Sequence, residues 1–478
     1  AVNDFEQQTC ETIKNNFDKV SSVLRIYSQE EAMDGTQDGN LFGLPNSTSA
    51  GFPIGKSKKK CLVRDPFDES VVKVPREFNG EFDIQKEIDR TLQCWRSGER
   101  SEPIYKASSK VNELLPTAKA LSKVRKFYGS PFANFVASRR VLAGIPEFMR
   151  HFQEDTECFV GVNATSEHWK KLHDFITTFS SDRMIAGDFA GFDTRMAAQI
   201  TTAAAKIMVN WYRTVGLSEE DLLLVRGALS DICNPNILID GDLYRFANGN
   251  PSGNLITVQL NSICNSIMMR YVYYRLNPKV KQSFNNNVKL ATYGDDNAMG
   301  VKRSCGWFTH TACAKEFEKV GIEYTMADKS TKSIPYIGID KITFLKRNFV
   351  THEVLNTIVA PIEIDSILKK FYWVKKSTDC PLSNAEQFGA YTDGSFREMY
   401  LHGRKVYDQF TANIKSIVEA NDELKHEVHF MTFDEMTVVL KPDYVEGSQL
   451  NCPRKIFVES LGINDPSEFP EIGNTIES

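Results

Sequence analysis

The sequence lacks several patterns that would place it in a specialised class of protein. No run approaches the roughly 18 consecutive apolar residues that a membrane-spanning helix needs. The first residues, AVNDFEQQTC, show no basic stretch followed by an apolar one, so we expect no secretory signal peptide. The ten cysteines are scattered without a C-x-x-C pair, which argues against a disulfide scaffold or a zinc ribbon and favours reduced thiols. For the local group Cys305, His310 and Cys313, ordinary helix packing is favoured over metal binding.

The composition is that of a globular protein with unevenly distributed charge. Hydrophobic residues make up 41% and aromatic residues 11% of the 478 residues, enough for two or three subdomains. The net charge of −5 does not indicate a nucleic-acid-binding protein. Residues 100–150, however, contain ten basic residues against three acidic ones. This segment is compatible either with a positive channel that attracts a polyanion or with a solvated basic surface.

Hydrophobic periodicity divides the chain into three parts. The first 180 residues are rich in turn signals and are expected to be irregular. The pattern then predicts a strand at 183–189, helices at 194–214 and 252–276, and a hairpin at 288–301. Beyond about residue 353 the pattern is helical, and Ser383 and Glu386 form an S-x-x-E capping box.

Two acidic motifs in the central part are the main candidates for chemistry. DFAGFD puts Asp188 at a strand end and Asp193 on the following turn, and YGDD puts Asp295 and Asp296 in a hairpin turn. If the two strands are neighbours, Asp188 and Asp295 can hold two Mg²⁺ ions about 4 Å apart, as phosphoryl transfer requires. Taken alone, GDD is more often an ordinary polar turn, so this interpretation depends on the other motifs.

The stretch SAGFPIGKSKKK is similar to a phosphate-binding P-loop but departs from its pattern. Ala50 stands where the first glycine is required, Gly51 comes one residue late, and Pro53 withholds an amide donor. The preceding PNSTS is not a strand. We therefore do not expect an ATPase site here.

Five motifs in order, DFAGFD, GNPSGNLITVQLNS, TYGDDN, ADKS and FLKRNF, resemble the palm motifs of RNA-dependent RNA polymerases of positive-strand RNA viruses. The resemblance is to the picornavirus-like group, and GNPSGN with YGDDN is similar to iflaviruses or dicistroviruses. It runs from about Thr48 to Phe349 and implies an α+β right-hand fold with fingers, an antiparallel palm sheet and a helical thumb. The implied boundaries are fingers 1–182, palm 183–228, a fingers insertion 229–249, palm 250–352 and thumb 353–478.

The resemblance also implies a role for each matching residue. The metal ligands would be Asp188, Asp295 and Asp296, and Lys329 would protonate the leaving pyrophosphate. Asp193 and Asn261 would read the ribose 2′-hydroxyl. Together with these two, the nucleotide-binding residues would be Ser252, Thr257, Lys110, Lys123 and Arg125, with Lys119 less certain. The RNA-binding residues would be Thr48, Ser49, Gly51, Gly253, Lys346 and Arg347.

Two departures from the family pattern leave details open. The family has an acidic pair directly after the lysine that Lys110 matches, whereas KVNELL contains only Glu113. The exact correspondence between this stretch and the family motif is therefore open around Lys110. Only 47 residues precede Thr48, where the family has a longer segment, so whether Ala1 is the natural terminus is also open.

The resemblance implies template-directed RNA synthesis from ribonucleoside triphosphates with Mg²⁺, for which Mn²⁺ can substitute. It further implies a product of a viral polyprotein that uses a genome-linked protein primer at membrane-associated replication complexes in the host cytoplasm. Two alternatives remain. A reverse transcriptase-like polymerase would prefer deoxyribonucleotides, and a non-catalytic RNA-binding replication protein would not depend on Asp295.

Overall fold

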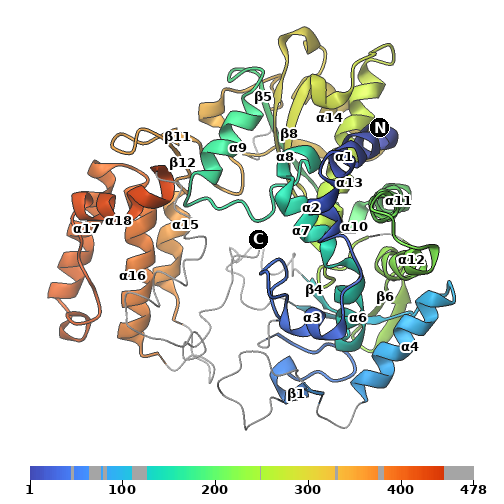
Figure 1. The fold of residues 1–478 in the computed structure, drawn as a ribbon. Helices are drawn as coiled ribbons and strands as arrows, with labels where there is room; N and C mark the ends of the chain where they lie inside the picture. The colour runs from blue at the N-terminus through green and yellow to red at the C-terminus, as the bar shows by residue number, and fades with distance from the viewer. Residues whose placement is uncertain are drawn as a thin grey trace. The chain divides into compact units, whose positions relative to one another are not determined.

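The structure, a computed structural model, describes residues 1–44, 48–63, 77–78, 83–109, 126–247, 249–328, 332–374 and 382–445. The chain divides into two compact units, one formed by Ala1–Gly161 and Arg183–Tyr336 and the other by Val162–Asp182 and Ile337–Ser478 (Figure 1). The division of the chain into fingers, palm and thumb remains a prediction.

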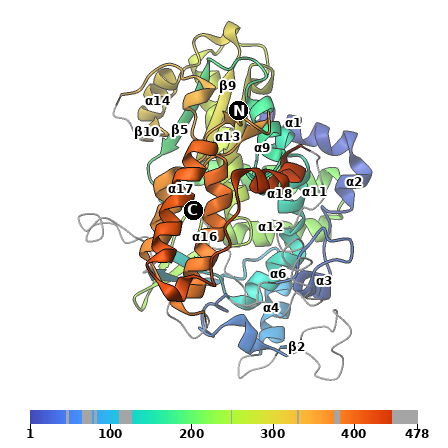
Figure 2. The ribbon, with the colours of Figure 1, turned by 90° about the vertical axis from the view of Figure 1, so that its left-hand side faces the viewer.

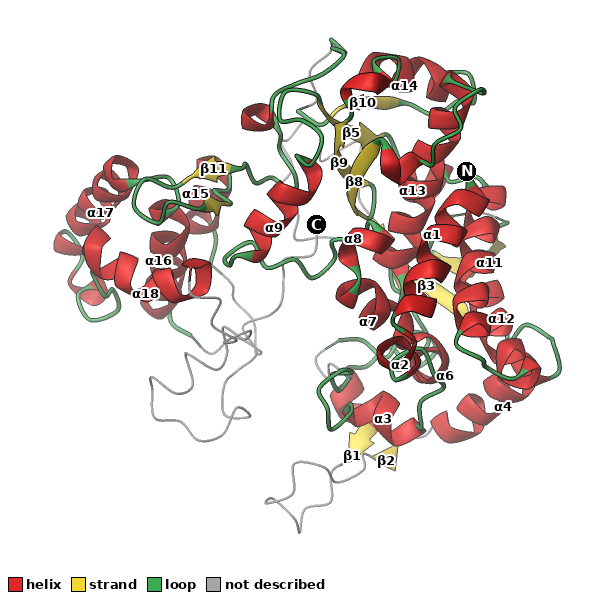
Figure 3. Ribbon diagram, turned by 45° about the horizontal axis from the view of Figure 1, so that its top comes forward, coloured by secondary structure: helices red, strands yellow, loops and turns green. Residues whose placement is uncertain are grey.

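The first unit contains a four-stranded antiparallel sheet in the order β10-β5-β9-β8 (Figure 3). Its strands are β5 (Met184–Phe189), β8 (Val288–Tyr293), β9 (Asp296–Val301) and β10 (Tyr324–Met326). These strands read as apolar runs because helices cover them: α13 (Thr257–Leu276) packs on β8, and α14 (His310–Glu318) packs on β5 and β10. The predicted strand and the predicted hairpin are therefore confirmed.

Further helices of the first unit pack on α13 and on one another. The helix α1 (Val2–Asn15) packs on α11 (Ala198–Thr214) and α13, and α11 also packs on α12 (Glu219–Cys233). The helices α4 (Ile84–Arg96) and α6 (Phe132–Leu142) pack against α12 and against each other (Figure 2). The shorter helices of this unit are α2 (Phe17–Ser21), α3 (Gln29–Asp34), α7 (Gly144–His151), α8 (Gln153–Thr156) and α10 (Phe192–Arg195).

A second sheet of the first unit has the strand order β4-β3-β6-β7. Its strands are β3 (Ile104–Ser109), β4 (Lys126–Gly129), β6 (Asn236–Ile239) and β7 (Asp242–Arg245). The pair β3–β6 is parallel and the other pairs are antiparallel. A two-stranded ladder joins β1 (Leu62–Val63) to β2 (Glu77–Phe78).

The prediction of an irregular N-terminal part was wrong for much of the first 180 residues, which contain α1, α4, α6 and α7. The sequences of α1 and α6 show why two of these helices are hard to predict. The stripe of α1 that faces the core includes Thr9 and Thr12 beside Phe5 and Ile13, so it is only partly apolar. The helix α6 is buried around most of its circumference and has no polar face to reveal its period.

The second unit is mainly helical. Its elements are α9 (His168–Ile176), β11 (Val350–Thr351), β12 (Ile358–Val359), α15 (Ile364–Leu368), α16 (Asn384–Tyr400), α17 (Arg404–Glu419) and α18 (Phe433–Val445). Aromatic side chains of α16, α17 and α18, among them Phe396, Tyr407 and Phe433, form its core. The capping box predicted at Ser383 and Glu386 is confirmed at the start of α16.

Among the described residues, no helix combines the length and the apolarity needed to cross a membrane.

Candidate active site

The pairing of β5 with β9 brings the two acidic motifs to one edge of the central sheet. Gly187 pairs with Asn297, so the next residue of β5, Asp188, continues the ladder toward Asp296, the first residue of β9. On the other side of β9, Tyr293 pairs with Asp296, which leaves Gly294 and Asp295 as the hairpin turn. Gly294 takes a φ of 64°, the left-handed conformation that a two-residue hairpin turn requires. We call residues 294–296 the acidic turn.

The chemistry of this edge fits divalent cations. Facing residues on paired antiparallel strands lie about 4.5–5.5 Å apart, so carboxylates on Asp188 and on the acidic turn can share an ion between them. Carboxylate oxygens are the ligands that Mg²⁺ prefers, and few protein ligands leave positions for substrate phosphates. Within the part of the chain that the structure describes, no group of three or more His, Cys, Asp and Glu residues is arranged to hold a metal. Asp188, Asp295 and Asp296 therefore do not form such a group, and the candidate site rests on the strand register and on the chemistry of carboxylates.

On β10, Thr325 pairs with Asp188, and its hydroxyl donates to the Asp188 carbonyl oxygen at 3.4 Å. The ring of Tyr324 lies over Gly187, where a Cβ atom would stand 2.0 Å from the ring carbon that bears its hydroxyl. A glycine is therefore required immediately before Asp188. The Tyr324 hydroxyl donates to Asn297 Oδ1 at 2.7 Å and joins β10 to β9 across β5.

Asn261, in the first turns of α13, lies beside the acidic turn. Asn261 is buried and its Oδ1 accepts a 2.9 Å hydrogen bond from Asn250 Nδ2. A Cβ atom on Gly294 would lie 4.0 Å from the Asn261 Cβ atom, so the two residues are neighbours. The Thr257 hydroxyl donates to the Pro251 carbonyl oxygen and orders the loop before α13. The predicted sugar-reading asparagine and the predicted metal ligands are thus adjacent.

Two glycine-containing loops pack on the same backbone segment at the end of β4. A Cβ atom on Gly253 would stand 1.6 Å from the Tyr128 carbonyl oxygen, and one on Gly51 would stand 2.1 Å from the Ser130 carbonyl oxygen. Ser252 Oγ accepts a 3.3 Å hydrogen bond from the Tyr128 N–H. The motifs TSAGFP and GNPSGN are therefore brought together although about 200 residues separate them in the sequence.

The lysine run that follows TSAGFP does not form a phosphate cradle of the P-loop kind. A short 3₁₀ turn at Lys58–Cys61 and the strand β1 follow the loop, where a P-loop requires an α-helix. Lys58 is buried, donates to Thr48 Oγ1 at 2.9 Å and lies over the Phe135 ring. Burial lowers the pKa of Lys58 to about 8, and the nearby Arg139 acts in the same direction. Within the loop, Ser49 Oγ accepts from the Gly51 N–H at 3.1 Å.

In the second unit, the motif FLKRNF forms a tight turn with Lys346 exposed at its tip. Phe344 and Arg347 exchange backbone hydrogen bonds of 3.0 and 2.9 Å, and the residues between them, Leu345 and Lys346, both have positive φ. Such a conformation is costly for residues other than glycine, and strained turns of this kind are concentrated at functional sites. The Arg347 guanidinium is engaged with the Glu398 carboxylate at 2.7 and 2.9 Å, so Lys346 is the more accessible cation of the pair.

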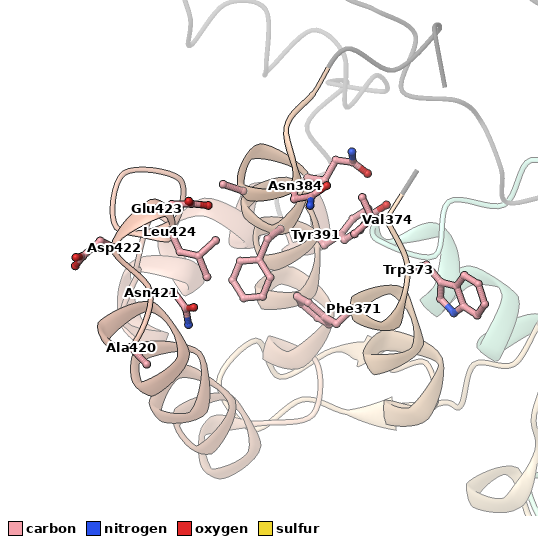
Figure 4. A pocket seen from close by; sticks show the side chains of 13 residues that line it. Phe371, Trp373, Val374, Asn384, Tyr391, Ala420, Asn421, Asp422, Glu423 and Leu424 are labelled. Atoms are coloured by element: carbon pink, nitrogen blue, oxygen red, sulfur yellow. The ribbon is translucent and has the colours of Figure 1, made fainter. Parts of the chain in front are cut away.

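The second unit also contains a pocket of about 610 Å³ between the start of α16 and the end of α17 (Figure 4). Aromatic side chains such as Phe371 and Tyr391 line it, with Asp422 and Glu423 at its margin. None of the predicted site residues lies in this pocket.

Several predicted residues lie outside the described part of the chain: Lys110, Lys119, Lys123, Arg125 and Lys329. The backbone of Asp193 lies in α10, directly after Gly191, but its side chain is outside the description. For Cys305, His310 and Cys313, burial accompanies ordinary contacts: His310 stacks on Tyr324 and bonds to Ser333.

A buried ion pair close to the acidic turn was missed from the sequence. The Arg270 guanidinium pairs with the Glu157 carboxylate at 2.6 and 2.7 Å, and both side chains are fully buried. The Glu157 carbonyl oxygen accepts from the N–H and the hydroxyl of Thr292 on β8. Arg270 also bonds to Asp4 and Gln8 of α1. No local sequence signal joins these positions, because their partners are more than a hundred residues apart.

A sheet of this order, with an acidic hairpin beside a second acidic strand end, is consistent with the right-hand fold of a nucleic-acid polymerase. The fold comparison agrees: the chain is similar to the Sicinivirus 3Dpol RNA-dependent RNA polymerase, with a TM-score of 0.70 and 18% identity, over 87% of this chain and 81% of that one. The predicted α+β right-hand fold is confirmed at this level.

Sequence comparison identifies the family. The family model for viral RNA-dependent RNA polymerases matches residues 1–418, and the chain belongs to this family. It is 28% identical to the replicase polyprotein of Drosophila C virus over 90% of this chain, and 25% identical to that of cricket paralysis virus over 86%. The chain spans about a quarter of the length of these relatives, 25% and 24% respectively.

The family membership confirms the resemblance found in the sequence and the expected class of enzyme, an RNA-directed RNA polymerase. The family's substrates are RNA and ribonucleoside triphosphates, and its members generally use divalent metal ions.

Proposed function

We propose that this chain extends an RNA strand on an RNA template by two-metal-ion nucleotidyl transfer at the edge formed by Asp188, Asp295 and Asp296. The observation that carries the proposal is the β5–β9 register, which brings two motifs separated by more than a hundred residues to one sheet edge. Mg²⁺ ions held there, or Mn²⁺ in their place, would lower the pKa of the attacking 3′-hydroxyl and neutralise charge on the triphosphate.

The residues around this edge position the substrates. The 3′-oxygen of the growing strand forms a bond to the α-phosphorus of the incoming nucleotide, and the bond from that phosphorus to the pyrophosphate breaks. Asn261, held by Asn250, and Asp193 read the 2′-hydroxyl, because buried polar groups that a deoxyribose leaves unpaired disfavour the wrong sugar. Lys329 provides the cation or the proton at the leaving pyrophosphate.

The other sites follow the same scheme. Lys110, Lys123 and Arg125 contact the triphosphate, as basic side chains do in phosphate recognition. The RNA template contacts the loop of Thr48, Ser49 and Gly51 and the loop at Gly253. Ser252 and Thr257 belong with Asp193 and Asn261 to the network that binds the incoming nucleotide. The priming strand contacts the exposed Lys346, with Arg347 holding the turn through Glu398.

The cellular context is also a proposal. The relatives are replicase polyproteins of viruses, which supports a polyprotein product acting in the host cytoplasm. Membrane-associated replication complexes and a genome-linked protein primer are the setting that the picornavirus-like resemblance implies.

Primer extension on a homopolymer RNA template, with Mg²⁺ and separately with Mn²⁺, tests this function. We expect ribonucleotide incorporation by the wild-type chain and its loss in Asp188→Asn and Asp295→Asn variants that remain folded. A preference for deoxyribonucleotides would instead support a reverse transcriptase. RNA binding without synthesis by the wild-type chain would support a non-catalytic replication protein.

A further inference from the structure

The peptide groups of the acidic turn are held by two buried side chains of α13. Asn265 Nδ2 lies 3.1 Å from the Gly294 carbonyl oxygen, 2.9 Å from that of Asp295 and 3.5 Å from that of Asp296. Ser262 Oγ accepts a 2.9 Å hydrogen bond from the Gly294 N–H. Both side chains are fully buried. The backbone of the turn is thus fixed from the helix at both its donor and acceptor groups.

The geometry of α13 explains why these two residues act together. They are three positions apart, so they lie on one face of the helix, and they follow Asn261 within one turn. Asn265 makes these contacts only with its amide nitrogen, and its Oδ1 has no partner among the described residues. A buried amide oxygen without a partner is costly, and the contacts on the other side of the same amide group offset that cost. The position is therefore adapted to donating hydrogen bonds to the turn.

A third contact supports the same peptide. Asn297 Nδ2 donates to the Asp295 carbonyl oxygen at 3.4 Å, and Tyr324 holds Asn297 from β10. The contacts that Ser262, Asn265 and Asn297 make with the acidic turn all engage its backbone atoms.

We infer that Ser262 and Asn265 are positioning residues that aim the Asp295 and Asp296 carboxylates for metal binding without touching substrate themselves. The inference rests on the function proposed above. We call the hydrogen bonds that Ser262 and Asn265 make with the acidic turn the clamp. Because the clamp engages peptide groups, it fixes the direction of the Asp295 and Asp296 side chains and does not compete with cations for their carboxylate oxygens. A misplacement of about 1 Å at a reacting centre can cost about 100-fold in rate, so removal of the clamp is expected to act on the chemical step.

The same helix turn links sugar recognition to metal placement. Asn261 neighbours Gly294, and the next residue, Ser262, bonds to the Gly294 N–H. A shift of this helix turn therefore moves the 2′-hydroxyl contact and the metal ligands together.

The test uses Asn265→Ala, with Asn287→Ala as the matched control. Asn287 is also buried, also donates through Nδ2, in this case to the Tyr273 hydroxyl at 2.7 Å, and also has an Oδ1 without a partner among the described residues. It precedes β8, at the end of the hairpin opposite the acidic turn. Both variants lose one buried amide, but only Asn265→Ala releases the turn.

Single-nucleotide addition is measured per active enzyme, after titration of elongation-competent complexes. For Asn265→Ala we expect kcat to fall roughly 10- to 100-fold while KM for the nucleotide changes less than about threefold. For Asn287→Ala we expect per-site kcat within about twofold of wild type, whatever its thermal stability. Equal per-site kcat in Asn265→Ala and wild type would overturn the inference.

Mn²⁺ binding to the RNA-free protein, followed by electron paramagnetic resonance, gives a readout that does not depend on activity. Asn265→Ala is expected to weaken Mn²⁺ binding, and Asn287→Ala is not. Unchanged Mn²⁺ affinity in Asn265→Ala would contradict the inference. Wild-type protein that binds Mn²⁺ but synthesises no RNA would contradict the proposed function and leave the positioning role to be judged by metal affinity.

A second pair of variants covers the case in which Asn265→Ala does not fold. Ser262→Ala removes the acceptor for the Gly294 N–H, whereas Ser262→Thr keeps it. We expect kcat to fall roughly 3- to 10-fold in the alanine variant and to be restored in the threonine variant. An alanine variant with wild-type kcat and wild-type Mn²⁺ affinity would overturn the inference.

Discussion

Arg270 and Glu157 form a bidentate ion pair in which both side chains are fully buried. Arg270 belongs to α13, and the Glu157 carbonyl oxygen accepts a hydrogen bond from Thr292, three residues before Asp295. Arg270 also bonds to Asp4 of α1. The N-terminal helix and the candidate active site thus share one polar network.

Removal of the cation from this network is expected to destabilise the first unit strongly. Arg270→Met leaves the Glu157 carboxylate buried without its partner, which typically costs about 3–5 kcal/mol. The change is measured as the free energy of unfolding in urea. The double variant Arg270→Met with Glu157→Gln is expected to recover part of the loss, because no buried charge remains. A loss below about 1 kcal/mol in the single variant would show that the pair contributes little.

Burial of Lys58 is expected to make the free energy of unfolding rise with pH in the alkaline range. Its pKa is about 8 in the folded protein and near 10.5 in the unfolded chain, so the unfolded chain binds more protons between these values. The free energy of unfolding of the wild type should therefore rise from pH 8 to pH 10.5 relative to Lys58→Met. Below pH 8 the difference between the two proteins should be constant. If the free energy of unfolding of the wild type, relative to Lys58→Met, fell between pH 8 and pH 10.5, the lowered pKa of Lys58 would be contradicted.

Gly253 tests the packing of the two loops on β4. In Gly253→Ala the new Cβ atom would meet the Tyr128 carbonyl oxygen at 1.6 Å, so the backbone must move. We expect a loss of stability of about 1–3 kcal/mol together with slower elongation. Gly306→Ala is the control, because its Cβ atom would meet only a side-chain atom at 4.0 Å. Similar behaviour of the two variants would refute the close approach.

Asn261 is expected to favour ribonucleotides over deoxyribonucleotides. In Asn261→Ala the ratio of kcat/KM for a ribonucleotide over the matching deoxyribonucleotide should fall roughly tenfold or more, because the 2′-hydroxyl loses a polar partner. Ser266→Ala is the control on the same helix, since its buried hydroxyl has no hydrogen-bond partner among the described residues. An unchanged ratio in Asn261→Ala would remove Asn261 from sugar recognition.

The sequence predicts the central elements because their signals are local. The apolar run before Asp188 indicates a buried strand, and a glycine and two aspartates between apolar segments indicate the hairpin at 288–301. The order of several motifs along the chain predicts that DFAGFD and YGDD are neighbours in the fold. The antiparallel pairing of β5 with β9 confirms that the two motifs are neighbours.

The remaining features depend on contacts between distant residues, which local patterns do not encode. Lys58 belongs to a run of charges that indicates a solvated surface, yet it is buried among Thr48 and two phenylalanine rings. Asn265 lies in a helix whose other residues are mostly buried, so its polarity alone does not reveal that the acidic turn is its partner. Packing between residues distant in the sequence determines both the burial of Lys58 and the partner of Asn265.

The central claim is that Asp188 shares cations with the acidic turn. Crystals of the protein soaked in Mn²⁺, with the ions located by their anomalous scattering, test it most directly. The account predicts an ion within about 2.0–2.6 Å of carboxylate oxygens from both Asp188 and Asp295 or Asp296. Ions bound elsewhere, or to one of the two motifs without the other, would contradict it.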